Sequence, residues 1–189
     1  MTASPNISVL RLKGEELELC RPGQPAQHIG DLTLLPKPTV FAAPSDSVRL
    51  TTLEIAADEV KHLARSLPFL LEDQVVEPIE DLHFARQPLS ENRWLVALVR
   101  RDQVSRWQAS LPQGWEGPWY PAALLLPWQS GEVTMVIEED RSSPAPDDGS
   151  VLIRWGETDG ARSDTGLLPA IFEAIQFKPD LVVVYGQNQ

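Results

Sequence analysis

Hydrophobic positions along the chain fall into short extended segments and a few helical repeats. Apolar segments bounded by turn residues predict strands, and apolar residues spaced three and four apart predict helices. The predicted strands are 9–12, 17–20, 39–43, 48–55, 82–85, 94–99, 133–137, 151–155, 161–165 and 181–185. The predicted helices are one that begins after Asp58, then 102–110 and 169–177. This order of elements predicts a mixed α/β (α+β) fold.

The first predicted helix contains a proline. Its apolar residues recur at helical spacing and are Val60, Leu63, Ala64, Leu67 and Leu71. We expect Asp58 to be the N-cap, because its carboxylate can accept a hydrogen bond from a free N–H of the first turn. Pro68 lacks the N–H that would bond to the Ala64 carbonyl, so the pattern predicts a kink or a break into two helical pieces.

Three further segments carry specific expectations. Residues 111–128 mix proline, glycine and tryptophan around the apolar run 122–126, which predicts a strand leading into a turn. Residues 141–149 predict a polar loop. The continuous apolar run 181–185 predicts a strand buried on both faces.

Composition and charge narrow the class of protein. The chain has 189 residues, 42% of them hydrophobic, which is typical of a globular protein of one domain or two small lobes. Its 16 Lys and Arg against 27 Asp and Glu give a net charge of −11. Such a chain is poorly suited to bind nucleic acid or an anionic membrane surface, because both need basic patches. Residues 1–8 show no signal peptide, and no segment approaches the roughly 20 apolar residues of a transmembrane helix.

Motifs for nucleotide binding, hydrolysis or metal binding are missing from the sequence. The single cysteine, Cys20, excludes an internal disulfide and is best interpreted as an inert buried thiol. The histidines His28, His62 and His83 lack metal-ligand spacing, so we expect no metal site, no cofactor and no catalytic residue. His83 follows Glu80 and Asp81, whose carboxylates could raise its pKa and make it a base. A strand histidine hydrogen-bonded to a polar neighbour is the favoured alternative.

Five carboxylates crowd one stretch of ten residues without a Lys or Arg among them: Glu72, Asp73, Glu77, Glu80 and Asp81. A solvated face near the first helix is one interpretation. The other is an acidic docking surface for a basic partner, because complementary potentials speed association. Trp115 and Trp119 present a similar choice between an interface and core or loop packing, and packing is favoured.

The stretch from Ala64 to Ala85 resembles the cytoplasmic domain of type II secretion system protein L, also called general secretion pathway protein L. That family has a helix ending in Leu-Pro-aromatic and Leu-Glu-acidic, then an acidic pair followed by a hydrophobe, His and an aromatic residue. The matching positions are Leu67, Pro68, Phe69, Leu71, Glu72, Asp73, Glu80, Asp81, Leu82, His83 and Phe84. Weaker similarity extends over most of 50–186, whereas the first fifty residues match only in being rich in strands.

The resemblance implies an actin-like, RNase H-like two-lobed fold. It assigns about 1–50 and 112–189 to the core and about 51–111 to an inserted strand-helix-strand-strand-helix subdomain. An actin-type nucleotide site would need an Asp-x-Gly hairpin, and Lys13-Gly14-Glu15 stands in its place without the Asp. We therefore expect no ATP binding and no enzymatic activity.

For function, the resemblance implies a scaffold on the cytoplasmic face of a Gram-negative inner membrane. The domain would recruit the secretion ATPase, protein E, through that partner's N-terminal region and couple it to protein M and the pseudopilus. Homodimerisation is also implied. Full-length members continue into a transmembrane helix and a periplasmic domain, so we expect this chain to be the cytoplasmic part alone. Two alternatives stay open: an actin-like ATPase or pilus-assembly protein with a degenerate nucleotide site, and an α/β enzyme that uses His83.

Overall fold

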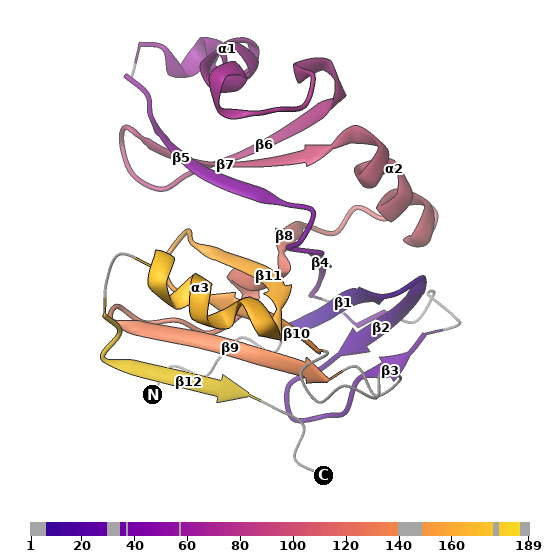
Figure 1. Ribbon diagram of the computed structural model, residues 1–189. Coiled ribbons are helices and arrows are strands. Elements are labelled where there is room, and N and C mark those ends of the chain that lie inside the picture. Colours follow the sequence, from indigo (N-terminus) through magenta and orange to yellow (C-terminus); the bar gives the residue numbers. More distant parts are fainter. Residues whose placement is uncertain are drawn as a thin grey trace.

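Three β-sheets organise the protein, as the computed structural model in Figure 1 shows. The structure describes residues 7–29, 35–36, 38–56, 58–139, 149–175 and 178–185. Two sheets lie side by side in the lower part of Figure 1, and the third lies above them with α1 and α2. Helices and strands alternate along the chain, so the predicted mixed α/β class is confirmed.

The first sheet has five strands in the order β3-β2-β1-β4-β8. Their bounds are β1 (Ser8–Lys13), β2 (Glu16–Cys20), β3 (Gln27–His28), β4 (Thr39–Ala43) and β8 (Trp119–Pro121). β1 and β2 form the predicted hairpin, and β1 then pairs with β4 in parallel. Gly14 in the hairpin turn has a φ of 62°, a conformation that glycine adopts without steric cost.

The second sheet has four strands in the order β11-β10-β9-β12. Their bounds are β9 (Glu132–Glu139), β10 (Gly149–Arg154), β11 (Gly160–Asp164) and β12 (Leu181–Tyr185). The short helices η6 (Thr165–Leu167) and α3 (Leu168–Ala174) follow β11, and α3 packs Leu168, Ile171 and Phe172 against the core of this sheet. β10 and β11, at the predicted strands 151–155 and 161–165, pair antiparallel as a hairpin.

The third sheet has three antiparallel strands in the order β5-β7-β6, with bounds β5 (Arg49–Glu54), β6 (Leu82–Pro88) and β7 (Arg93–Arg100). Between β5 and β6 lie η2 (Val60–His62), α1 (Leu63–Leu71), η3 (Glu72–Gln74) and η4 (Ile79–Asp81), and α2 (Arg101–Ser110) follows β7. Figure 1 shows α1 on the face of this sheet that is turned away from the other two sheets. The sequence of elements is the predicted strand-helix-strand-strand-helix order.

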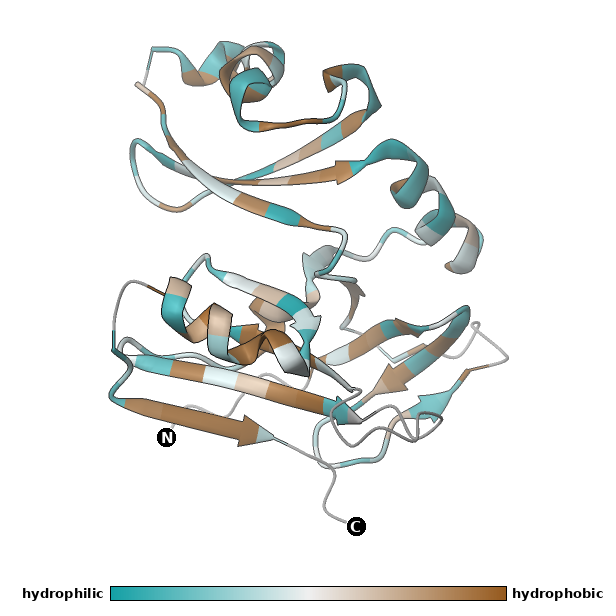
Figure 2. Cartoon of the chain, viewed as in Figure 1, coloured by the Kyte–Doolittle hydropathy of each residue, from teal (hydrophilic) through white to brown (hydrophobic). Residues whose placement is uncertain are grey.

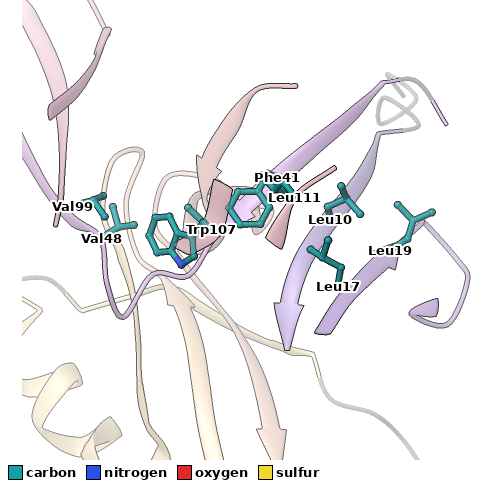
Figure 3. Close-up of a cluster of buried hydrophobic side chains, with 9 residues drawn as sticks. Leu10, Leu17, Leu19, Phe41, Val48, Val99, Trp107 and Leu111 are labelled. Carbon is teal, nitrogen blue, oxygen red and sulfur yellow. The ribbon is translucent and has the colours of Figure 1, made fainter. Parts of the chain in front are cut away.

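A shared apolar cluster joins the third sheet to the first (Figure 3). Val99 of β7 and Trp107 of α2 pack with Phe41 of β4 and Leu10 of β1, all of them buried. The rings of Phe41 and Trp119 also meet edge to face, with centroids 4.9 Å apart. β7 and α2 are therefore held against the first sheet by side-chain packing as well as by the connecting chain.

The helix α1 runs through Pro68 without a break, so of the two expected outcomes, a kink or a break into two pieces, the break is wrong. Leu63, Leu67 and Leu71 are at most 1% exposed and lie on one face of α1. Burial of one such side chain contributes about 1.5–3 kcal/mol, so the three together outweigh the roughly 3 kcal/mol cost of an internal proline. Asp58 is not the N-cap either: Glu59 precedes η2, His62 precedes α1, and neither makes a side-chain capping bond.

Two other expectations are corrected by the structure. The apolar run 122–126, expected within a strand, is mostly the 3₁₀-helix η5 (Ala122–Leu125), which follows β8 directly. β12 forms as predicted but is not buried, since Leu181, Val182, Val184 and Tyr185 are 41–53% exposed. The reason is its place at the edge of the second sheet, where Figure 2 shows it as a continuous hydrophobic strand. The predicted polar loop 141–149 lies almost wholly outside the described residues.

Candidate partner-binding surface

The five predicted docking carboxylates all lie in the connection between α1 and β6. Glu72 and Asp73 begin η3, Glu77 lies in the loop that follows, and Glu80 and Asp81 end η4. All five residues are exposed, and within the described part of the chain none of them forms an ion pair. We call these five residues the acidic segment.

The alternation of apolar and acidic residues explains why the acidic segment faces solvent. Val75 and Ile79 are partly buried and pack, together with the buried Leu82, against the cluster formed by α1 and the third sheet. Because these three side chains turn inward, the acidic residues between them turn outward. The alternation of apolar and acidic residues therefore both anchors the connection between α1 and β6 and exposes its carboxylates to solvent.

Two basic residues lie near one end of the acidic segment. The Arg101 Nε donates a hydrogen bond of 2.8 Å to the Glu80 carbonyl oxygen, and Arg100 pairs with Asp102 at 3.0 Å. The charges of Asp81 and Glu77 help to raise the pKa of Arg100, after the larger effects of Asp102. Positive charge is thus brought to the η4 end of the segment.

Glu72 and Asp73 occupy an electrostatically unfavourable place at the C-terminal end of α1. The carbonyl groups at that end carry a partial negative charge, and a carboxylate beside them costs roughly 0.3–1 kcal/mol. The last turn of α1 contains no basic residue that would offset it. The end of α1 is therefore a negative pole.

Three exposed apolar side chains beside this pole were not anticipated from the sequence. Phe69 is 78% exposed, Leu70 is 47% exposed and Val76 is 98% exposed. We call them the α1 patch. The spacing contained the signal, because Phe69 follows the buried Leu67 by two residues, or about 200° around a helix. That rotation places Phe69 on the opposite face from the leucines.

His83 does not fit the role of a base activated by its neighbours. Its pKa is lowered, first by burial and then by the charge of Arg101. The expectation that Glu80 and Asp81 would raise its pKa is wrong, because burial and, after it, the charge of Arg101 oppose protonation. Among the described residues, no group of three or more His, Cys, Asp or Glu side chains could hold a metal ion.

Trp115 and Trp119 take the packing roles that were favoured for them, whereas Cys20, expected to be buried, is half-buried and lines a hollow. Cys20 is half-buried, and burial raises the pKa of its thiol more than the charge of Arg11 lowers it. Trp115 and Trp119 are partly buried and pack against the cluster of the first sheet. Trp119 also contacts Trp107, with ring centroids 6.3 Å apart.

A hollow of about 990 Å³ lies between the β1–β2 hairpin, α2 and the second sheet. Its lining includes Lys13, Gly14 and Glu15, which stand where an actin-type nucleotide site would have its Asp-x-Gly hairpin. Glu138 of β9 accepts bonds here from Arg11 of β1 and from Arg162 of β11, the latter at 2.6 Å. The Arg11–Glu138 pair ties the first sheet to the second across the hollow, whereas the Arg162–Glu138 pair lies within the second sheet.

A solved protein domain has the same fold as this chain. Over 96% of this chain and 83% of the other, it aligns at a TM-score of 0.65 and 16% identity with the cytoplasmic domain of EpsL, described as an inner-membrane component of the type II secretion system of Vibrio cholerae. The chain is thus a mixed α/β domain with the fold of that cytoplasmic domain. No helix in the described part combines the length and apolar character that crossing a bilayer requires.

Sequence comparison identifies the family. The model of the type II secretion system protein L family matches residues 5–186, so the chain belongs to that family. Type II secretion system protein L of Pectobacterium carotovorum subsp. carotovorum is 33% identical over 71 residues, 38% of this chain. The protein of the same name from Dickeya chrysanthemi is 33% identical over 64 residues, 34% of this chain. These matches span only 17% and 16% of the two relatives.

Proposed function

We propose that this domain is a non-enzymatic scaffold of the type II secretion machinery that recruits the secretion ATPase, protein E. On this proposal it lies at the cytoplasmic face of the inner membrane and couples the ATPase to protein M and the pseudopilus. About 1–50 and 112–189 form an actin-like core, and about 51–111 form the inserted subdomain. The observation that carries the proposal is the acidic segment, whose five exposed carboxylates lack ion-pair partners in the described structure.

The contacts of the acidic segment support a docking role over a structural one. Charges that stabilise a fold are normally paired or placed to complement a helix dipole. Glu72 and Asp73 form no ion pair in the described structure, and although they begin η3 they directly follow the negative end of the longer helix α1. A basic partner would relieve this repulsion, and such complementarity raises the association rate and its dependence on salt.

The hollow beside the β1–β2 hairpin supports a scaffold over an actin-like ATPase. A phosphate site there would need an acidic residue to hold the metal and free backbone N–H groups. The hairpin turn, Lys13-Gly14-Glu15, lacks the Asp of an Asp-x-Gly hairpin, and the Arg11–Glu138 ion pair crosses the hollow. We expect no heat of binding when Mg-ATP is titrated into the domain, and micromolar binding would favour the ATPase alternative.

The acidic segment is tested by removing its charge without changing its size. We expect the variant Glu72→Gln, Asp73→Asn, Glu77→Gln to bind the N-terminal region of the cognate ATPase about five- to tenfold more weakly at low salt. The difference should shrink at high salt, where charges are screened within about 3 Å at 1 M. Fluorescence titration at two salt concentrations measures both effects.

A matched variant removes the same number of charges elsewhere. Glu91, Glu116 and Glu173 are exposed and form no ion pair in the described structure. Their replacement by Gln should leave the affinity within about twofold of wild type. Equal weakening by both variants would show a general effect of net charge and would remove the acidic segment as the docking surface.

A further inference from the structure

We propose that the α1 patch, Phe69, Leu70 and Val76, is the apolar anchor of the partner site, and that its occupant is a basic amphipathic helix. This inference rests on the proposed function and adds the chemistry of the partner surface. Together the three side chains, which lie within eight residues of the chain, expose on the order of 300–400 Å² of apolar surface. Patches of this size beside charged residues mark protein contacts.

The patch is not needed for folding of the domain. The core of this region consists of the opposite face of α1, with Leu63, Leu67 and Leu71 packed on the third sheet. Phe69 faces away from that sheet, Leu70 lies at the flank of the leucine face and is 47% exposed, and Val76 is almost fully exposed although its neighbour Val75 packs inward. A fold that needed only solubility would place polar side chains at these positions.

The geometry of α1 favours a helix as the occupant. A helix has no extended backbone edge to which a strand could be added, so α1 offers its side chains to a partner. α1 has nine residues and is therefore about 14 Å long. A partner helix of about three turns would match this length, with apolar residues spaced i, i+3 or i+4, and i+7.

Charge complementarity indicates where the partner helix should carry its positive charge. Glu72 and Asp73 make the C-terminal end of α1 negative, and Glu77 lies just beyond Val76. Lys61 and Arg65, both exposed, lie at the opposite end of α1. The occupant should therefore carry Lys or Arg where it meets η3, beside the apolar residues that cover Phe69. A binding site of this kind has an apolar centre and a charged rim.

The test removes the apolar anchors and leaves the charges in place. In a fluorescence titration with the N-terminal region of the cognate ATPase, we expect the variant Phe69→Gln, Leu70→Gln, Val76→Thr to bind at least tenfold more weakly than wild type. The loss should persist at 1 M salt, unlike the effect of removing the carboxylates. Because the three side chains are exposed, the variant should keep the wild-type circular dichroism spectrum and melting temperature within a few degrees.

A matched control replaces three exposed apolar residues near the second sheet. Leu167, Val182 and Val184 are 41–53% exposed. The variant Leu167→Ser, Val182→Thr, Val184→Thr should bind as wild type does. Wild-type affinity in the α1 patch variant would overturn this inference and leave the proposed function intact. Failure of the wild-type domain to bind the ATPase region at all would overturn both.

Discussion

At the scale of single residues, the sequence indicated which side chains bear charge but not what surrounds them. The acidic segment was visible as a run of carboxylates without a basic residue. The lowered pKa of His83 was not visible in the sequence. It depends on burial and on Arg101, which lies eighteen positions away in sequence on α2 and comes close to His83 only in the fold. The α1 patch could have been found from helical spacing, since Phe69 falls opposite Leu67.

His83 gives a prediction about stability and pH. Its pKa is lower in the folded protein than the ordinary value of 6.5, so the unfolded chain binds the proton first as the pH falls. The folded state therefore loses stability as the pH drops below about 6.5. We expect His83→Gln to lose less unfolding free energy than wild type between pH 7 and pH 5, as measured by urea denaturation. An unchanged pH dependence would contradict a lowered pKa of His83 in the folded protein.

At the scale of elements, local hairpins and most element positions were predictable, whereas long-range strand pairing and burial were not. The hairpin of β1 and β2 follows from local alternation and its glycine turn, and the structure has it with the expected bounds to within one residue. Burial of β12 could not be predicted, because a continuous apolar run is the same in a central and in an edge strand. Its position at the edge is set by long-range pairing with β9.

The exposed edge of β12 should make the domain associate with itself as its concentration rises. An apolar edge strand without charge is a template for pairing with a second chain, and a lysine on the strand blocks that pairing. We expect Val184→Lys to lower the apparent mass measured by light scattering at high protein concentration. Leu167→Lys, which adds the same charge outside the edge strand, should keep the wild-type mass. A wild-type domain that stays monomeric over the whole range would contradict the prediction.

At the scale of the whole molecule, the sequence predicted a mixed α/β fold but not how the three sheets are joined. Those joints are made by residues far apart in the chain. Trp107 and Phe41 join the third sheet to the first, and Glu138 joins the second sheet to the first through Arg11. No local pattern marks such pairs, because each residue alone is typical of its own helix or strand.

Glu138 should make a small and salt-dependent contribution to the joint between the sheets. Its side chain and those of Arg11 and Arg162 are 31–33% exposed, so solvent screens the pairs. We expect Glu138→Gln to lower the unfolding free energy by about 0.5–1 kcal/mol at low salt and by less at 1 M. Glu132→Gln, which breaks no ion pair of the described structure, should have no such effect in the same urea titration. A loss that is independent of salt would contradict an electrostatic joint.

The most direct test of the scaffold proposal is the dissociation constant of the unmodified domain for the N-terminal region of its cognate secretion ATPase. Isothermal titration calorimetry near physiological salt measures it without a label. We predict a one-to-one complex with a dissociation constant of tens of micromolar or lower, weakening as salt is raised. No detectable complex at several hundred micromolar would contradict the central claim.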